Sequence, residues 1–358
     1  MNNNTIKSEY TYYYWLDTFR FLSAFLVMLT HLRFYCFTNY GGLNTESKTI
    51  FTKVLFFLTN LGNDAIIVFF VISGFLVGGK TIEKIANHED ISAKSFAIKR
   101  IVRIVLPLFA VLVINTIFNI IQGIPNDWYR IIGNLLCLQG AFVNPEPGVG
   151  VLWTMSYIVW FYVLIFGIIL LSKKDIKHIV AGLITIIAVF WIFSRMGQSV
   201  FNVFYIAMGI LAYFLTKKKI NKKIWIISIL IAIISTLLHS VSKGSLSSSL
   251  SVESYLIQSI QMVSYAVVIG LSTQLIPQKK ALKTERFFSK ISKISYSLYL
   301  IHLPIILMMV HLGMQRLPYV SLKSLSIFFC GIVICTLCGY LFYYIAEKPS
   351  ENLKKYIK

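Results

Sequence analysis

Charged residues are scarce in this chain of 358 residues. Only 13% are Asp, Glu, Lys or Arg, whereas soluble domains carry roughly 25%. Hydrophobic residues make up 57%, and the mean hydropathy is +0.73. Because this apolar excess extends over the whole length, it excludes a soluble domain with one anchor and predicts a polytopic membrane protein.

Cysteine and long hydrophilic stretches are also rare. Of the five cysteines, the pair in "CTLC" (335–338) has redox or metal spacing, but the sequence offers no second ligand pair. We interpret the pair as small apolar residues of a buried helix and expect no metal site. The first apolar run lacks a small-residue cleavage site, so we expect it to stay as a helix. No hydrophilic stretch is long enough for a soluble domain, so we expect residues 1–358 to form a single membrane domain.

Apolar runs of about 20 residues, the length that crosses a bilayer, recur along the chain. We predict an all-α transmembrane bundle of about ten spans. They cover residues 15–37, 50–78, 101–122, 152–172, 178–194, 200–216, 224–240, 254–276, 294–313 and 321–346. The shorter segment 128–143, between "PNDWYR" and "NPEPGVG", is predicted to be a re-entrant or interfacial helix.

Basic residues outnumber acidic ones by 34 to 14, which gives a net charge of +20. They gather in short loops between apolar runs, as in "TKKKINKK" (216–223) and at 277–293, and they favour alternate loops. By the positive-inside rule, this asymmetry predicts that both termini are cytoplasmic. The clusters suit anionic membrane lipids, and their position argues against a nucleic-acid partner.

The first predicted span, "WLDTFRFLSAFLVMLTH" (15–31), carries three polar residues inside an apolar run. Arg20 and His31 are eleven positions apart, about three helical turns, so they point the same way and lie roughly 16 Å apart along the axis. Asp17 is three residues before Arg20, on nearly the same face. Such residues usually line a cavity or pathway, because burying a charge in lipid is costly. The alternative is an Asp–Arg pair at the membrane boundary and a histidine in the core.

Two further stretches combine apolar runs with residues that suit a ligand. In "KRIVRIVLP" (99–107), Arg100 and Arg103 lie one helical turn apart on the predicted cytoplasmic side. Two guanidinium groups on one face suit phosphate oxygens, although ordinary positive-inside anchoring explains them too. In "FFVISGFLVGG" (69–79), the Ser-Gly pair permits close helix packing or the close approach of a ligand.

The C-terminal part holds two more candidates. "SYSLYLIHLPI" (295–305) places His302 before Pro304, which leaves a backbone carbonyl free in that span. "YYIAEKPSENLKK" (343–355) places Glu347 at the end of the last span, where a solvated interfacial acid is the alternative.

These stretches, taken together and in this order, resemble the acyltransferase-3 family of integral membrane acyltransferases over nearly the whole chain. The family opens with an "LDxxRxxA…H" helix, which "LDTFRFLSAFLVMLTH" matches without a gap between its arginine and its histidine. Further family motifs are matched by "FFVISGF", by Arg100, Arg103 and Pro107, by "LWTMSYIVWFY" (152–162), by Ser295 to Pro304, and by Glu347 and Pro349.

The chain departs from the family pattern in one motif. After "LW" the family commonly has one or two glutamates, where this sequence has Ile158, Val159 and Trp160. A carboxylate that would contact the acceptor or support the histidine is therefore missing. The appended esterase-like domain of some relatives is also missing, so we expect the membrane domain or a partner to complete the transfer.

The resemblance implies transfer of an acyl group, usually acetyl, from acyl-CoA to a hydroxyl group, mostly on a glycan. Arg100 and Arg103 would bind the phosphates of CoA on the cytoplasmic side. His31 would act either as general base on the acceptor hydroxyl or as the nucleophile that carries the acyl group. Asp17 or Arg20 would orient the reacting groups or stabilise developing charge.

The acceptor would be a cell-surface or lipid-linked glycan that approaches from the outer side, near Trp153 and Tyr162. Their aromatic faces suit sugar rings, although residues of an aromatic belt look the same in sequence. Further candidate substrate contacts are Ser73, Tyr296, His302 and Glu347. The expected location is the cytoplasmic membrane of a bacterium, where enzymes of glycan synthesis are candidate partners.

Two other functions fit the same features. A proton-coupled transporter or flippase would also place arginine and histidine inside the membrane, and it would move substrate without a need for CoA. A non-catalytic scaffold in a glycan-synthesis complex would tolerate the missing glutamates.

Overall fold

The computed structural model describes residues 14–196, 201–218, 221–245, 252–275, 287 and 289–353. In these residues the chain is helical, and the only β-type pairings are two isolated bridges, Phe37 with Leu317 and Gln139 with Val143. Nine helical segments of the described chain are long and apolar enough to cross a membrane. The predicted polytopic all-α bundle is therefore confirmed.

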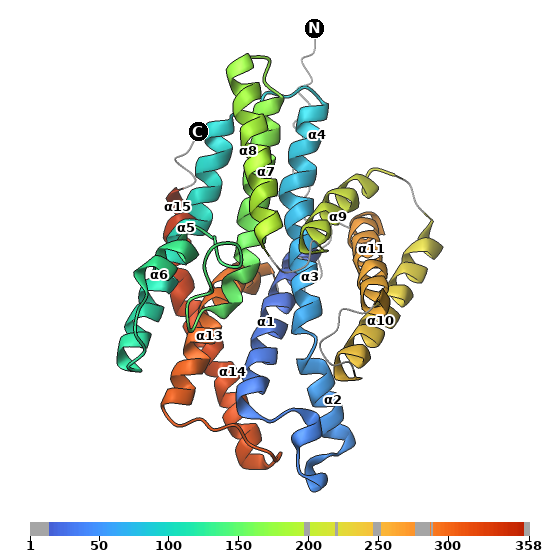
Figure 1. The fold of residues 1–358 in the computed structure, drawn as a ribbon. Coiled ribbons are helices and arrows are strands. Elements are labelled where there is room, and N and C mark those ends of the chain that lie inside the picture. Colours follow the sequence, from blue (N-terminus) through green and yellow to red (C-terminus); the bar gives the residue numbers. More distant parts are fainter. Residues whose placement is uncertain are drawn as a thin grey trace.

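The helices follow one another with short connections (Figure 1). Two π-helical segments, η3 (Gly74–Gly79) and η6 (Tyr343–Glu347), continue α3 into α4 and α14 into α15. The α-helices are α1 (Tyr14–Cys36), α2 (Ile50–Thr59), α3 (Gly62–Ser73), α4 (Lys80–Ala86), α5 (Ala93–Ile121), α6 (Trp128–Leu135), α7 (Trp153–Leu171), α8 (Ile176–Arg195), α9 (Phe201–Leu215), α10 (Lys222–Ser245), α11 (Val252–Leu275), α13 (Ser295–His311), α14 (Leu322–Phe342) and α15 (Lys348–Leu353).

Three of the predicted spans differ from the helices observed, and one of them, 50–78, is described below. The span at 200–216 is the 15-residue helix α9, shorter than the roughly 20 residues of a straight crossing. The helix predicted to begin at residue 101 begins at Ala93, so Arg100 lies inside α5 together with Arg103. Most of the basic cluster 277–293, and residues 219–220 of the other cluster, lie outside the described residues.

Helix α1 occupies the centre of the bundle. It packs against α3, α13 and α14, while α7 pairs with α8, and α10 with α11. In Figure 1 the α10–α11 pair stands to one side, joined to the rest through α9, and α5 lies near α15 on the opposite side. Polar residues of α1 therefore face the interior of the protein rather than lipid on all sides.

The segment predicted as one span at 50–78 is broken between α2 and α3. Thr30 of α1 holds the break, because its hydroxyl lies 2.6 Å from the carbonyl oxygen of Thr59 and accepts the N–H of Gly62 at 3.1 Å. A Cβ atom at Gly62 would lie 2.3 Å from this hydroxyl oxygen. The break therefore depends on a glycine and on a partner in another helix.

Helix α9 packs closely on the Ser-Gly stretch. A Cβ atom at Gly74 would lie 1.8 Å from the carbonyl oxygen of Ile206, and one at Gly209 would lie 2.0 Å from that of Val71. Both distances are far below van der Waals contact, so the two backbones meet only because each contributes a glycine. Of the two roles that the sequence left open, Gly74 serves helix packing.

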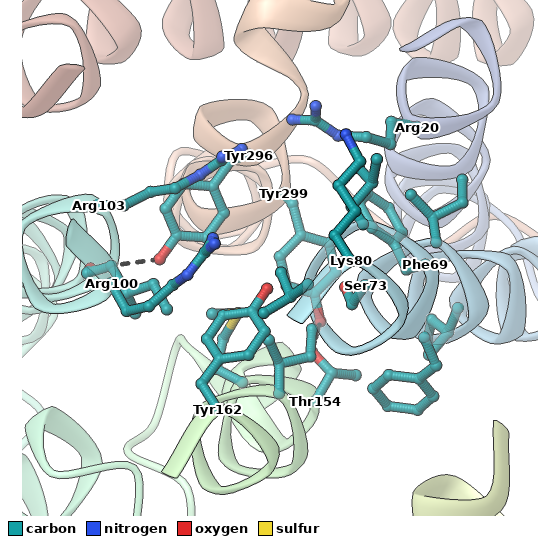
Figure 2. Close-up of a pocket in the computed structure, with 18 residues that line it drawn as sticks. Arg20, Phe69, Ser73, Lys80, Arg100, Arg103, Thr154, Tyr162, Tyr296 and Tyr299 are labelled. Carbon is teal, nitrogen blue, oxygen red and sulfur yellow. Dashed lines mark hydrogen bonds between the residues drawn. The ribbon is translucent and has the colours of Figure 1, made fainter. Parts of the chain in front are cut away.

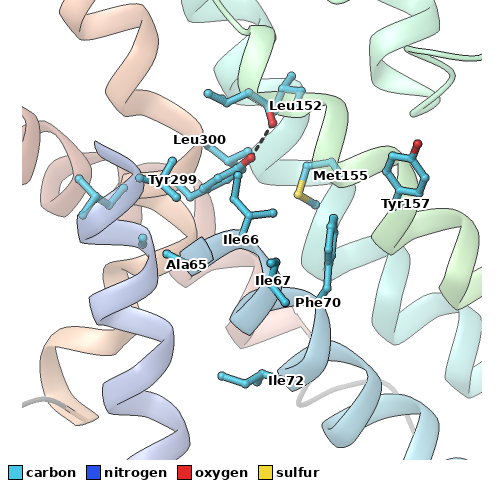
Figure 3. Close-up of a cluster of buried hydrophobic side chains, with 14 of the residues drawn as sticks. Ala65, Ile66, Ile67, Phe70, Ile72, Leu152, Met155, Tyr157, Tyr299 and Leu300 are labelled. Carbon is cyan, nitrogen blue, oxygen red and sulfur yellow. Dashed lines mark hydrogen bonds between the residues drawn. The ribbon is translucent and has the colours of Figure 1, made fainter. Parts of the chain in front are cut away.

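A buried hydrophobic cluster joins α3, α7 and α13 (Figure 3). Ile66 and Phe70 of α3, Met155 of α7 and Tyr299 of α13 belong to this cluster. The same four side chains line the cation-rich cavity described below. The core thus fixes the relative positions of the helices that build the site.

Helix α6 is amphipathic and ends at Leu135, earlier than the predicted limit of residue 143. Trp128 and Tyr129 are 66% and 70% exposed, whereas Asn134 is buried. An exposed aromatic face suits the membrane interface, which favours the interfacial of the two predicted alternatives. The remaining residues, 136–149, form a loop rather than a helix.

Hydrogen bonds to Glu146 fix the position of this loop. Glu146 is buried, and its Oε1 accepts a hydrogen bond from Asn119 at 3.2 Å, while its backbone N–H donates to Asn134 at 3.3 Å. Within the described chain, Oε2 has no hydrogen-bond partner. Burial raises the pKa of Glu146 above its ordinary value of 4.5, against a smaller opposing effect of Arg130.

Candidate active site

A cavity of about 260 Å³ opens among α1, α3, η3, α4, α5, α7 and α13. Four cations line it, Arg20, Lys80, Arg100 and Arg103, and no Asp or Glu is among the described lining residues. In Figure 2, Arg100 and Arg103 enter from one side, and Arg20 and Lys80 from the other. An accumulation of positive charge without carboxylates is the composition of an anion-binding site.

One donor atom of Arg100 has no partner. Its guanidinium carbon lies 5.3 Å from the ring centroid of Tyr162 and 5.4 Å from that of Phe96. Its Nε is buried and has no hydrogen-bond acceptor in the described part of the chain. A buried donor without a partner costs about 1–3 kcal/mol. An anion that accepted this hydrogen bond would remove the cost.

The position of Arg20 is fixed by neighbours on two helices. Its Nη1 donates to Asp17 at 3.3 Å and its Nη2 to Ser295 at 3.4 Å. The other carboxylate oxygen of Asp17 accepts a hydrogen bond from Ser289 at 3.4 Å. Asp17 is not among the cavity-lining residues. Asp17 therefore orients Arg20 and does not itself line the cavity, and a role of Asp17 on the reacting groups stays a prediction.

Lys80 is a lining residue that the sequence analysis missed. The sequence alone places it among several lysines of a predicted cytoplasmic loop. Helix α3, which starts at Gly62, continues through η3 into α4, which ends at Ala86. Lys80 is therefore the first residue of α4, and it lines the cavity. The signal that could have found it is its position directly after "SGFLVGG".

Besides apolar side chains, several residues with hydroxyl groups line the cavity. The predicted residues Ser73, Tyr162 and Tyr296 are all among them. The hydroxyl of Tyr296 donates to the carbonyl oxygen of Ile104 at 3.3 Å, which connects α13 to α5. Ser73 is the member of the Ser-Gly pair that remains available to a ligand.

Three residues near the cavity differ from the sequence prediction. Trp153 does not line the cavity and instead packs edge-on against Phe70 and Tyr157, with ring centroids 6.3 and 6.0 Å away. Thr154, its neighbour, does line the cavity and lies 2.6 Å from the hydroxyl of Tyr299. Thr154 and Tyr299 were missed because neither residue type is distinctive in an apolar helix.

His31 and His302 form a second polar cluster beside the cavity. Nε2 of His302 lies 3.4 Å from Nδ1 of His31, and the ring centroids are 5.2 Å apart. Neither histidine is a described lining residue, and Tyr299, which lines the cavity, has its ring 5.9 Å from that of His302. The predicted common face of α1 thus holds two adjacent parts, a cationic cavity around Arg20 and a histidine pair further along.

Glu347 is not a solvated acid at the membrane boundary. It is 2% exposed, and its Oε2 accepts hydrogen bonds from the backbone N–H and the hydroxyl of Ser297 at 3.2 and 2.6 Å. It also interacts electrostatically with Arg103 and Arg20. Glu347 therefore balances the charge of two cavity cations from outside the cavity lining.

These features define a multi-pass membrane protein with a cation-lined cavity among its helices. The acyltransferase-3 family model, described as an acyltransferase domain, matches residues 13–344, nearly the whole chain. The chain belongs to this family, as its motifs predicted, and is therefore a membrane acyltransferase that uses an acyl donor. No curated protein and no solved structure matches the chain.

Proposed function

We propose that this protein transfers an acetyl group from cytoplasmic acetyl-CoA to a hydroxyl group of a cell-surface or lipid-linked glycan. The observation that carries the proposal is the cavity with four cations and no carboxylate in its described lining. CoA is an anionic carrier with several phosphate groups, and arginine binds phosphate through paired N–H donors. Arg100 and Arg103 bind the phosphates in this proposal, with Lys80 and Arg20 on the opposite side.

The acyl group reaches His31 from this cavity. Arg20 and His31 are about 16 Å apart along α1, so the thioester end of the donor extends from the cations past Tyr299. The acceptor approaches His31 from the other side of the membrane, following the predicted topology. This arrangement keeps CoA in the cytoplasm while the modified glycan stays outside.

The reaction uses the lone pair on Nε2 of His31. As a general base, Nε2 takes the proton of the acceptor hydroxyl while its oxygen attacks the thioester carbonyl carbon. The carbon–sulfur bond then breaks, and the CoA thiolate leaves with the proton that His31 returns. As an acyl carrier, Nε2 attacks the thioester carbonyl carbon, the carbon–sulfur bond breaks, and the CoA thiolate leaves. The acceptor oxygen then attacks the acetyl group on Nε2, the carbon–nitrogen bond breaks, and the hydroxyl proton passes to the thiolate.

Labelled acetyl-CoA tests the proposal. Membranes with the wild-type protein should transfer label to glycan, and His31→Ala should abolish transfer. His178→Ala is the matched control, because His178 is exposed and pairs with Asp175. Equal labelling with wild type and His31→Ala would refute the role of His31. Substrate release across the bilayer without CoA would instead support a transporter.

Two further measurements complete the assignment. Incubation with labelled acetyl-CoA but without acceptor leaves label on the protein only if His31 carries the acyl group. Mass spectrometry of surface glycans from a deletion strain identifies the acceptor by the acetyl group that disappears. Loss of a succinyl or longer group would correct the donor.

A further inference from the structure

The hydrogen bonds of the histidine pair determine where its protons lie. Nδ1 of His31 lies 2.8 Å from the carbonyl oxygen of Val27, and Nδ1 of His302 lies 3.1 Å from that of Leu298. A carbonyl oxygen only accepts, so each Nδ1 must carry a proton. In a neutral imidazole the other nitrogen then holds a lone pair.

The contact between the two rings agrees with this assignment. Nε2 of His302, 3.4 Å from Nδ1 of His31, is an acceptor that faces a donor. The Nδ1–H of His31 is thus shared between Val27 on its own helix and His302 on α13. Nε2 of His31 is left with the lone pair that acyl transfer requires.

We infer that His302 is a positioning residue, which accepts a hydrogen bond from His31 and holds its ring with Nε2 ready to react. The inference rests on the proposed function. Val27 alone cannot fix the ring relative to the rest of the site, because it lies one turn before His31 on the same helix. His302 ties His31 to a second helix, and it is fully buried.

This role fits the chemistry of the surroundings. Second partners of catalytic histidines are often carboxylates. In the described structure no carboxylate is hydrogen-bonded to His31. The family resemblance leads us to expect glutamates where this chain has Ile158 and Val159. Here Nε2 of His302, instead of a carboxylate, is the acceptor for His31.

Two substitutions of similar size separate the two nitrogens of His302. His302→Gln places an amide oxygen near the position of Nε2 and keeps the acceptor for His31. His302→Asn places its amide nitrogen near the position of Nδ1, keeps the donor to Leu298, and is too short to reach His31. Both should leave CoA binding unchanged, because His302 does not line the cavity.

We expect His302→Asn to lower kcat by about 5- to 100-fold. The lower limit corresponds to the loss of one hydrogen bond, and the upper limit to a small misplacement of the base. His302→Gln should retain most of the activity, and both variants should keep the KM for acetyl-CoA. Equal losses in the two variants, or wild-type kcat in His302→Asn, would overturn the inference. If His31→Ala also retains activity, the catalytic role of His31 fails, whereas the proposed function itself fails if wild-type membranes transfer no label from acetyl-CoA.

The tautomer provides a second measurement that does not depend on variant folding. Solid-state NMR of the full chain, labelled with ring-15N histidine, distinguishes protonated from unprotonated ring nitrogens. We expect His31 to show a protonated Nδ1 and an unprotonated Nε2, with its signals identified by their loss in His31→Ala. A protonated Nε2 in neutral His31 would overturn the inference.

Discussion

Arg100 offers the sharpest test of the cationic cavity. Its guanidinium lies between two aromatic rings, and its Nε is buried without a hydrogen-bond acceptor among the described residues. A phosphate oxygen would accept a hydrogen bond from this N–H. Arg100→Gln removes both the charge and the fork of donors, whereas Arg100→Lys keeps the charge and removes only the fork.

The expected magnitude follows from the contacts. A hydrogen bond to a charged group contributes about 1.5–3 kcal/mol, and each 1.4 kcal/mol changes an equilibrium constant tenfold. Arg100→Gln should therefore weaken CoA binding by roughly 10- to 100-fold. Arg100→Lys should weaken it by less, because attraction to the phosphate remains while bidentate binding and ring stacking are lost.

The assay is isothermal titration of CoA into the purified protein in lipid nanodiscs at fixed salt concentration. Lys99→Gln is the matched control, since Lys99 is the exposed neighbour of Arg100 on α5 and does not line the cavity. It removes the same charge from the same region and should change the Kd by less than about twofold, because salt screens exposed charges. Equal weakening by Lys99→Gln and Arg100→Gln would show that only overall charge matters and would refute the cavity as the CoA site.

Three further predictions concern stability and topology. Gly74→Ala should destabilise the protein by about 1–3 kcal/mol because its Cβ meets backbone, whereas Gly41→Ala, with nothing within 4 Å of its Cβ, should leave the melting temperature in detergent unchanged. Burial raises the pKa of Glu146 above 4.5, so the folded state binds its proton more tightly than the unfolded state does. The stability contributed by this group therefore falls as the pH rises from 4.5 through the pKa of the folded state. The melting temperature of Glu146→Gln, relative to wild type, should therefore increase with pH, and a constant difference would contradict the shift. In a cysteine-free background of intact cells, Asn144→Cys should react with an impermeant maleimide and Asn87→Cys should not, and the reverse pattern would invert the predicted topology.

The membrane spans could be predicted because their signal is local. A run of about 20 apolar residues is sufficient to identify a span, and α8, for example, begins within two residues of its predicted start. The break between α2 and α3 could not be predicted in the same way, because it depends on the hydroxyl of Thr30 in another helix. The short helix α9 was overestimated because an apolar sequence does not state how much of it is helical.

Some residues of the candidate site could likewise be predicted from the sequence, and others could not. Arg20, Arg100 and Arg103 could be identified because charge in or beside an apolar run is conspicuous. Lys80 could not, because its sequence position looks like an ordinary loop, and only the continuation of the helix through η3 brings it to the cavity. The contact of His31 with His302 joins residues 271 positions apart, a distance that no local pattern encodes.

The composition of the cavity gives a physical reason for the absence of the expected glutamates. Ile158, at a position where the family resemblance leads us to expect a carboxylate, lines the cavity together with Arg100 and Arg103. A glutamate there would pair with these arginines and compete with an anionic donor for them.

Charge compensation comes instead from behind the lining. Asp17 is bonded to Arg20, and Glu347 interacts electrostatically with Arg103. Arg100 has only aromatic rings beside it. No carboxylate of the described chain pairs with Arg100, and this is the reason that a substitution there should affect donor binding more than the loss of an exposed lysine on the same helix.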